Sequence, residues 1–221
     1  MPNILLINPN TSPVTTDMMV RLVQERLPAG WEVTGCTAAS GVPMIVNEQE
    51  MAHAAVQVGH SWQRHARDRH WSAVIVSAFG DPGIAFVRGQ TRLPVAGICE
   101  ASLHAAAQGG RRFGIATVTP GLERLIAERV RDQGLEHAYT GIRFTEGDPC
   151  ALAADPARLR HALEGAVRDC VQQDGAQAVV IGGGPLGQAA AELQRSAGVA
   201  VIAPLAAVAA QLRLQLLGIT P

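Results

Sequence analysis

A short apolar pattern is written twice in this 221-residue chain, and the repeat constrains the fold more than any other feature. Residues 73–80 read AVIVSAFG and residues 178–185 read AVVIGGGP, each a strand pattern that runs into a turn of small residues. Two further pairs of segments match in the same order: 94–98 with 199–203, and 4–11 with 113–120. The chain is therefore predicted to contain two related halves, whose strands end in short turns.

Short apolar runs alternate with stretches of helical periodicity along the whole chain, which is typical of βαβ units and parallel sheets. The predicted strands lie near residues 3–8, 32–38, 73–78, 94–98, 112–118, 141–145, 178–182 and 199–203. The predicted helices lie near residues 13–28, 48–69, 100–109, 120–134, 156–173, 186–196 and 205–217. We therefore expect an α/β protein of two pseudo-symmetric, doubly wound (Rossmann-like) lobes, with the ligand site in the crevice where the carboxyl ends of the strands meet.

The two lobes are expected to be intimate halves, because no low-complexity segment or flexible linker divides them. We assign residues 1–98 together with 205–221 to the first lobe and residues 99–204 to the second. This assignment makes the final helix return to the first lobe. Two helix starts are well specified, since Ser12-Pro13 and Asp155-Pro156 each place a capping side chain before a proline.

The composition favours a protein that binds a small molecule. Apolar residues make up 48% of the chain, and 18 basic residues against 19 acidic ones give a net charge of −1. No basic cluster is interleaved with aromatic residues, so nucleic acid and anionic membranes are poor partners. The longest apolar stretch, residues 197–211, contains Pro204 and is too short to span a bilayer. The amino terminus lacks the pattern of a signal peptide, and we expect a cytoplasmic protein and a homo-oligomer.

Neither a metal nor a nucleotide cofactor is expected. The cysteines show no CxxC motif and no Cys/His spacing for zinc, which favours reduced thiols; they are Cys36, Cys99, Cys150 and Cys170. The histidines at positions 53, 60, 65 and 70 are spaced so that they do not form a metal-binding face. The glycine run at 182–184 lacks the third glycine of the GxGxxG fingerprint of dinucleotide-binding proteins.

The segment Asn8-Pro9-Asn10-Thr11-Ser12 follows the first predicted strand directly and precedes a helix. Side-chain amides and hydroxyls at this place, together with backbone N–H groups at a helix N-terminus, can bind a carboxylate or imide oxygen. In the alternative interpretation, Asn8 and Asn10 only shape a turn and Ser12 only caps the helix.

Four segments together carry a resemblance: LLINPNTS at 5–12, FGDPG at 79–83, LPVAGICEAS at 93–102 and VVIGGG at 179–184. In this order and spacing, which cover essentially the whole chain, they resemble the aspartate/glutamate/hydantoin racemase superfamily, and most of all its hydantoin and allantoin racemase branch. The resemblance implies that the two lobes enclose a small carboxylate or cyclic imide substrate and use no cofactor. It also implies two cysteine thiols, one per lobe, that exchange a proton on opposite faces of a carbon acid.

The chain departs from this family at both thiol positions. Ala78 stands immediately before FGDPG, where the family carries its first cysteine, and Gly183 stands where the second should follow Gly182. Neither side chain can accept or donate a proton. Of the chain's own cysteines only Cys99, at the end of the strand after the first turn, is a candidate replacement; its other interpretation is a small buried residue.

The remaining candidates are oxyanion donors and two carboxylates. Backbone N–H groups that follow Ala78 and Gly183 are expected to point into the crevice and to hold a carboxylate or enolate oxygen. The predicted substrate-binding residues are Asn10, Thr11, Ala78, Phe79, Gly80, Thr117, Thr119, Gly183 and Gly184. Asp81 and Glu100 are the candidate catalytic acid or base, although Asp81 can also form a turn or a helix cap, and Glu100 can also be a charge favoured by a helix dipole.

Three hypotheses about function stay open. In the first, the chain is an enzyme that acts on a small carboxylate or hydantoin-like imide without paired thiols, by isomerisation, decarboxylation, elimination or ring opening. In the second, it is a catalytically silent member that kept the pocket and binds a small molecule. In the third, it is a racemase of the hydantoin type in which the family's cysteines are dispensable.

Overall fold

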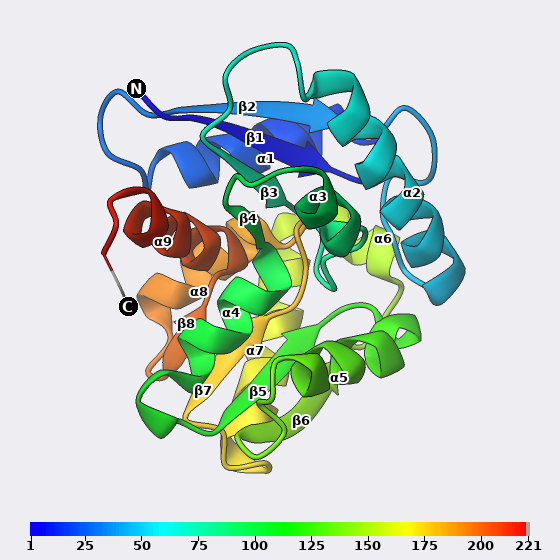
Figure 1. Ribbon diagram of the computed structural model, residues 1–221. Coiled ribbons are helices and arrows are strands. Elements are labelled where there is room, and N and C mark those ends of the chain that lie inside the picture. The colour runs from blue at the N-terminus through cyan, green and yellow to red at the C-terminus, as the bar shows by residue number, and fades with distance from the viewer. Residues whose placement is uncertain (220–221) are drawn as a thin grey trace.

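The computed structural model describes residues 1–219 and contains two four-stranded parallel sheets (Figure 1). The first sheet is built from β1 (Asn3–Asn8), β2 (Glu32–Thr37), β3 (Ala73–Val76) and β4 (Val95–Gly97), in the order β2-β1-β3-β4. The second is built from β5 (Phe113–Thr117), β6 (Tyr139–Phe144), β7 (Ala178–Ile181) and β8 (Ala200–Ile202), in the order β6-β5-β7-β8. The two orders are the same, which confirms the repeat and the α/β fold class predicted from it.

The helices that connect the strands are α1 (Pro13–Gln24), α2 (Glu48–His65), α3 (Ile84–Gln90), α4 (Ile98–Ala107), α5 (Glu123–Asp132), α6 (Pro149–Ala153), α7 (Pro156–Gln172), α8 (Gly187–Ser196) and α9 (Pro204–Leu216). Two short 3-10 helices, η1 (Gln108–Gly110) and η2 (Pro120–Leu122), lie before and after β5. Both predicted caps are confirmed. The Ser12 hydroxyl accepts the N–H of Thr15 at 3.2 Å, and the Asp155 carboxylate accepts the N–H of Arg158 at 3.1 Å.

Several element boundaries differ from the prediction. Helix α3 was not predicted, because its seven residues are too few to show a period; it forms because Ile84 and Val87 pack into the core of the first sheet. The short helix α6 was missed for the same reason of length. The predicted helix over 120–134 is η2 followed by α5, and the one over 48–69 ends at His65.

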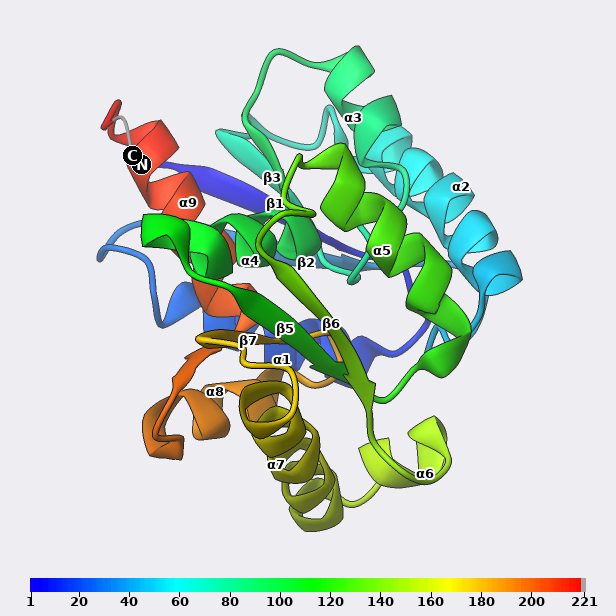
Figure 2. The same cartoon turned by 90° about the horizontal axis from the view of Figure 1, so that it is seen from below.

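Helices cover both faces of each sheet, and α4 lies between the two sheets (Figures 1 and 2). Ile98 and Ala101 of α4 belong to the core of the first sheet, whereas Cys99 and Leu103 belong to that of the second. The halves therefore share one continuous interior.

The final helix, α9, packs on the first sheet. Its Leu205, Val208 and Leu212 are buried in the same cluster as Ile4 and Ile75 of β1 and β3. This is the packing expected of a helix that returns to the first lobe, while the residue boundaries assigned to the two lobes stay a prediction.

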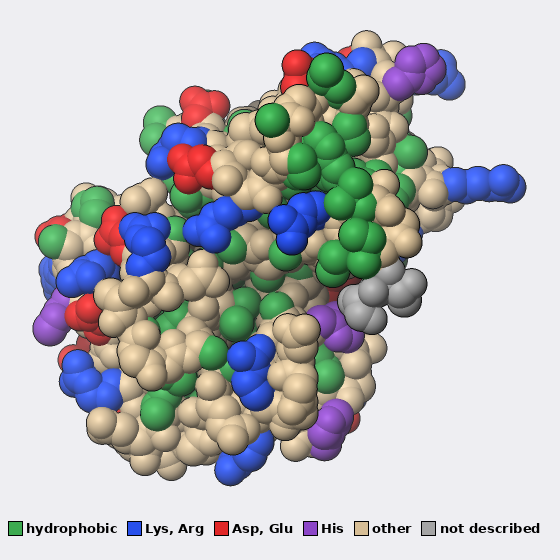
Figure 3. Space-filling model, turned by 90° about the vertical axis from the view of Figure 1, so that its left-hand side faces the viewer, with side chains coloured by type: hydrophobic (Ala, Val, Ile, Leu, Met, Phe, Trp, Pro, Cys, Tyr) green, Lys and Arg blue, Asp and Glu red, His purple; other side chains and the backbone are tan. Residues whose placement is uncertain are grey.

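The surface carries both signs of charge side by side. All 18 basic residues are arginines, and Figure 3 shows basic and acidic side chains interspersed on the face that it presents. Within the described part of the chain, none of the helices combines the length and the apolar character that crossing a bilayer requires.

Candidate active site

A small pocket lies between the two sheets, at the carboxyl ends of β3, β5 and β7. Ala78 and Gly183, the positions at which the resemblance implies thiols, both line it. The prediction that these two residues share one crevice is therefore confirmed. The pocket volume is about 30 Å³, which is room for the centres of only a few water molecules. A substrate with a ring therefore needs the walls to move apart before it can enter.

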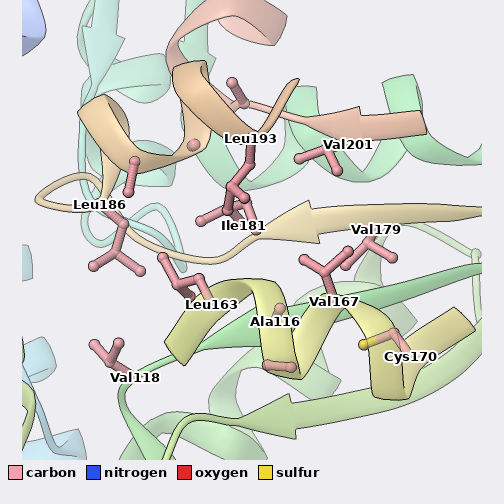
Figure 4. Packing of buried hydrophobic residues seen from close by; sticks show 14 of the residues in the cluster. Ala116, Val118, Leu163, Val167, Cys170, Val179, Ile181, Leu186, Leu193 and Val201 are labelled. Atoms are coloured by element: carbon pink, nitrogen blue, oxygen red, sulfur yellow. The ribbon is translucent and has the colours of Figure 1, made fainter. Parts of the chain in front are cut away.

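One wall of the pocket is apolar and was not predicted. It consists of side chains from the segment between β2 and α2, from α2, from η2 and α5, and from the turn before α8: Met44, Ile45, Met51, Leu122, Ile126 and Leu186. Two residues of the pocket lining, Leu186 and Val118, also belong to the hydrophobic core cluster of the second sheet. They lie near the ends of β7 and β5 (Figure 4). No sequence motif marks the segment around Met44 and Ile45, which has no periodicity of either kind.

No ionisable side chain of the described residues lines the pocket. Its only side-chain nitrogen and oxygen atoms belong to Asn10 and Thr119. An amide and an aliphatic hydroxyl can bind an oxyanion but cannot take a proton from carbon near neutral pH.

The residues that line the pocket also carry backbone N–H groups. Within residues 1–219, no protein acceptor pairs with the N–H groups of five residues that line it: Ala78, Phe79, Val118, Thr119 and Gly184. Unpaired buried N–H groups are rare in folded proteins, because each one loses a hydrogen bond to water. A cluster of them at the strand ends is suited to a carboxylate or enolate oxygen.

Asn10 adds a side-chain donor to this cluster. Its Oδ1 accepts the N–H of Ser12 at 3.0 Å and the Nδ2 of Asn8 at 2.8 Å. Because a backbone N–H can only donate, the atom that faces the Ser12 N–H must be the amide oxygen, Oδ1. The other amide atom is therefore Nδ2, and it has no acceptor among the described residues. Asn10 is 3% exposed and lines the pocket.

The two threonines predicted for the site differ in position. The Thr119 hydroxyl lies at the pocket, 3.2 Å from that of Thr117. Thr117 is fully buried and does not line the pocket; its hydroxyl donates to the carbonyl of Gly182 at 2.5 Å. Thr117 thus holds the glycine turn in place, while Thr119 can reach a ligand.

The glycine turn brings backbone of the two sheets together. A Cβ added to Gly184 would lie 2.5 Å from the carbonyl oxygen of Ser77, so only glycine fits there. A Cβ added to Gly183 would meet the side chain of Leu186 at 2.8 Å. The φ angle of Gly183 lies outside the left-handed region, so a side chain at this position is opposed by Leu186 and not by the backbone.

Asp81 is buried beside the pocket without lining it. Its carboxylate accepts the N–H groups of Cys99 at 2.9 Å and Glu100 at 2.8 Å, and therefore caps α4. Burial raises the pKa of Asp81 to about 7, and these two hydrogen bonds oppose the rise. Its φ of 49° is the one positive value among the non-glycine residues described, a conformation that costs about 1–3 kcal/mol.

Three further predicted residues lie outside the pocket lining. Glu100 forms an ion pair with Arg88 and accepts the N–H of Gly97 at 3.1 Å. Thr11 donates its N–H to the carbonyl of Val42, and Gly80, in the turn after β3, lines a neighbouring surface hollow instead. No catalytic or binding role is established for any residue of the site, and these assignments stay predictions.

None of the cysteines lines the pocket. Burial raises the pKa of the Cys36 and Cys170 thiols to about 12, and it raises that of Cys99 well above the usual range, with the charge of Asp81 adding to the effect. Cys99 is therefore a neutral thiol within the core, and Cys150 is exposed. The described residues contain no group of three or more His, Cys, Asp or Glu side chains placed to hold a metal ion.

Two sheets of the same strand order with a pocket between their strand ends define an α/β protein of two repeated lobes. The sequence profile of the Asp/Glu/Hydantoin racemase family matches residues 4–212, and the chain belongs to this family.

Named relatives agree with this assignment. The chain is 28% identical to a hydantoin racemase from Paenarthrobacter aurescens, over 92% of this chain and 86% of that protein. It superposes on the allantoin racemase from Klebsiella pneumoniae with a TM-score of 0.91 at 26% identity, covering 100% of this chain and 90% of the other. An arylmalonate decarboxylase, with a TM-score of 0.64 and 19% identity over 96% and 92% of the two chains, shares the fold.

Proposed function

We propose that this chain is a cofactor-independent enzyme of its family that acts on a small carboxylate or a hydantoin-like cyclic imide without exchanging a proton between paired thiols. The observation that carries the proposal is the pocket lining. Ala78 and Gly183 both line the pocket, and no ionisable side chain of the described residues lines it with them.

The donors of the pocket support binding of an oxyanion. Phe79, Thr119 and Gly184, whose N–H groups have no acceptor among the described residues, line the pocket together with Asn10, and most of the remaining lining is apolar. In such a space fixed dipoles stabilise developing negative charge more strongly than water does.

Among the possible reactions, decarboxylation demands least of this pocket. When a carboxylate leaves as CO₂, the electron pair of the broken C–C bond moves onto the neighbouring carbonyl or carboxylate oxygens, which the N–H groups hold. Water can then return a proton to carbon. No base is needed in the first step, whereas racemisation needs one on each face of the carbon. Elimination, ring opening and one-sided isomerisation each require one acid or base, and the substrate itself would have to supply it.

A catalytically silent binding protein is the second candidate, and the same lining supports it. Loss of both thiols removes the family's acid and base but leaves the oxyanion donors intact. The third candidate, a hydantoin-type racemase, is supported by the relatives that carry this name. Its acid and base would have to come from Asp81 and Glu100, which lie outside the lining.

A panel of ligands distinguishes the three candidates. The protein is incubated in D₂O with single enantiomers of 5-benzylhydantoin and allantoin and with phenylmalonate, and NMR and chiral chromatography follow the mixtures. We expect turnover of a panel member without racemisation of the remaining substrate. Binding at the amides of Phe79 and Thr119 without any turnover would favour the silent protein. Racemisation with exchange of the carbon-bound hydrogen would overturn the proposal.

The cytoplasmic location and the homo-oligomeric state expected from the sequence belong to the same proposal. Size-exclusion chromatography with light scattering gives the oligomeric state, and a single monomer peak across the working concentration range would contradict it.

A further inference from the structure

The Asp81 carboxylate lies where two parts of the fold meet. It is 2% exposed and bridges the turn after β3 to the first N–H groups of α4, 18 and 19 residues further along the chain. Gly97, just before α4, leaves the room for it, since an added Cβ there would overlap the carboxyl group. Both the turn after β3 and the start of α4 are therefore shaped to accommodate the Asp81 carboxylate.

The same turn presents two of the pocket's donors. The N–H of Asp81 donates to the carbonyl of Ala78 at 3.0 Å, which closes a four-residue turn over 78–81. The unpaired N–H groups of Ala78 and Phe79 belong to this turn. Gly80 has a φ of 107°, which glycine adopts without cost, whereas the φ of 49° at Asp81 is unfavourable and must be offset by the contacts of its side chain.

We propose that Asp81 is a positioning residue, whose ionised carboxylate anchors the turn on α4 and so directs the Ala78 and Phe79 N–H groups at the bound oxyanion. This inference rests on the proposed function for its ligand. It replaces an acid or base role for Asp81, because both carboxylate oxygens are occupied by α4 and neither faces the pocket.

Protonation is expected to weaken this anchor, because a carboxylic acid keeps only part of the acceptor capacity of the carboxylate. The pKa of Asp81 lies near 7, raised by burial and by the charge of Glu100 and lowered by its two hydrogen bonds and by Arg129. Cys99 is the other titratable neighbour, and Arg88 neutralises Glu100. A surface hollow beyond Gly80 and Pro82 carries the remaining charged groups near the turn: Glu48, Arg124, Glu128 and Asp132.

Binding and stability should therefore respond to pH in opposite directions. The pKa of Asp81 is higher in the folded chain than its ordinary value of 3.8, so the folded state binds the proton more tightly. The contribution of Asp81 to stability consequently falls as the pH rises from about 4 to about 7. Ligand binding, which needs the ionised carboxylate, should instead strengthen over the upper part of this range. A merely structural aspartate would not produce this opposition.

The test uses phenylacetate, which stays ionised between pH 6 and pH 8, so that any pH dependence of its affinity belongs to the protein. In the native chain we expect its dissociation constant to be about threefold or more higher at pH 6 than at pH 8. The backbone amide shifts of Ala78, Phe79, Cys99 and Glu100 should titrate together with a midpoint near 7. Asp81→Asn should remove both dependences and weaken binding at pH 8, while thermal unfolding shows that the fold is retained.

Asp155→Asn is the matched control, because Asp155 also accepts a backbone N–H at the start of a helix, but that helix is α7 and Asp155 does not line the pocket. It should leave affinity and its pH dependence unchanged. If the amides of Ala78 and Phe79 do not titrate in the native chain, or keep their native shifts in Asp81→Asn, the inference is overturned. If those amides titrate as expected but neither phenylacetate nor 5-benzylhydantoin binds, the positioning role stands and the proposed function fails.

Discussion

Asn10 shows how one side chain can both build the site and face the ligand. Its carbonyl oxygen is used twice within the turn that follows β1, and its amide nitrogen is left for the pocket. The two ends of the side chain can therefore be tested separately.

Asn10→Asp keeps the oxygen that accepts hydrogen bonds from Ser12 and Asn8, and it replaces the amide nitrogen, a donor, with a second acceptor oxygen. We expect phenylacetate to bind more weakly by about 1–3 kcal/mol, because a buried ligand oxygen loses its partner and meets a like charge. The melting temperature should change little. Asn3→Asp, at the amino end of β1 and so at the end of the strand away from the pocket, is the control and should leave the affinity unchanged. Equal affinity of Asn10→Asp and native protein would place the ligand elsewhere.

The two threonines should separate stability from binding. Thr117→Val leaves the buried carbonyl of Gly182 without its donor and should lower the free energy of unfolding by about 1–3 kcal/mol. Thr119→Val removes a hydroxyl at the pocket and should change the affinity for phenylacetate more than the stability. Urea titration and calorimetry measure the two quantities. A larger loss of affinity in Thr117→Val and a larger loss of stability in Thr119→Val would contradict the positions of these two hydroxyls.

Of the cysteines, only Cys150 should react with an alkylating reagent. Iodoacetamide reacts with thiolates, and burial keeps Cys36, Cys99 and Cys170 neutral well above pH 8. We expect mass spectrometry of the native protein to find a single adduct, at the exposed Cys150, with ligand binding unchanged. Labelling of Cys99 accompanied by loss of binding would instead assign that thiol to the site.

At the scale of elements, the segment over residues 38–47 is what closes the pocket. It brings Met44 and Ile45 to the apolar wall, and the carbonyl of Val46 lies so near η2 that a Cβ on Gly121 would be 2.6 Å from it. At its end Arg124 of α5 makes a two-pronged ion pair with Glu48 of α2, at 2.8 and 2.5 Å. We expect this contact between the halves to loosen when a ligand enters so small a pocket.

Glu48→Gln should therefore raise hydrogen exchange in the segment over 38–47, because the pair that fastens it to α5 is broken. The melting temperature should hardly move, since both side chains are exposed and such pairs add little stability. Glu136→Gln, which breaks the exposed pair with Arg131, is the control. Exchange that is equal in the two variants would show that the ion pair does not fasten the segment.

The elements themselves were largely predictable, because buried parallel strands are continuous apolar runs. The end of β3 was not: the strand was predicted to reach Ala78 but stops at Val76, and the turn over residues 78–81, closed by the hydrogen bond from the Asp81 N–H to the Ala78 carbonyl, follows almost at once. Helix α3 was missed because its formation depends on packing against the sheet.

For the whole molecule, the repeated pattern was enough to predict two related sheets and a crevice that both Ala78 and Gly183 line. The apolar wall could not be predicted, because Met44 and Leu122 are far apart in sequence and neither belongs to a motif. The surroundings of Asp81 also depend on the tertiary fold, since only the docking of α4 on the turn brings Cys99 and Glu100 to its carboxylate.

This pocket lacks the two bases that racemisation requires, so a variant that restores them should gain that activity. The variant carries Ala78→Cys and Gly183→Cys, with Leu186→Ala to make room at position 183. A matched control carries serine at both positions with the same Leu186→Ala. Each is incubated with one enantiomer of 5-isopropylhydantoin, the uncatalysed rate is subtracted, and chiral chromatography measures inversion. We expect racemisation by the cysteine variant alone, with the native chain and the serine control at the rate of buffer. Racemisation by the native chain as fast as by the cysteine variant would contradict it.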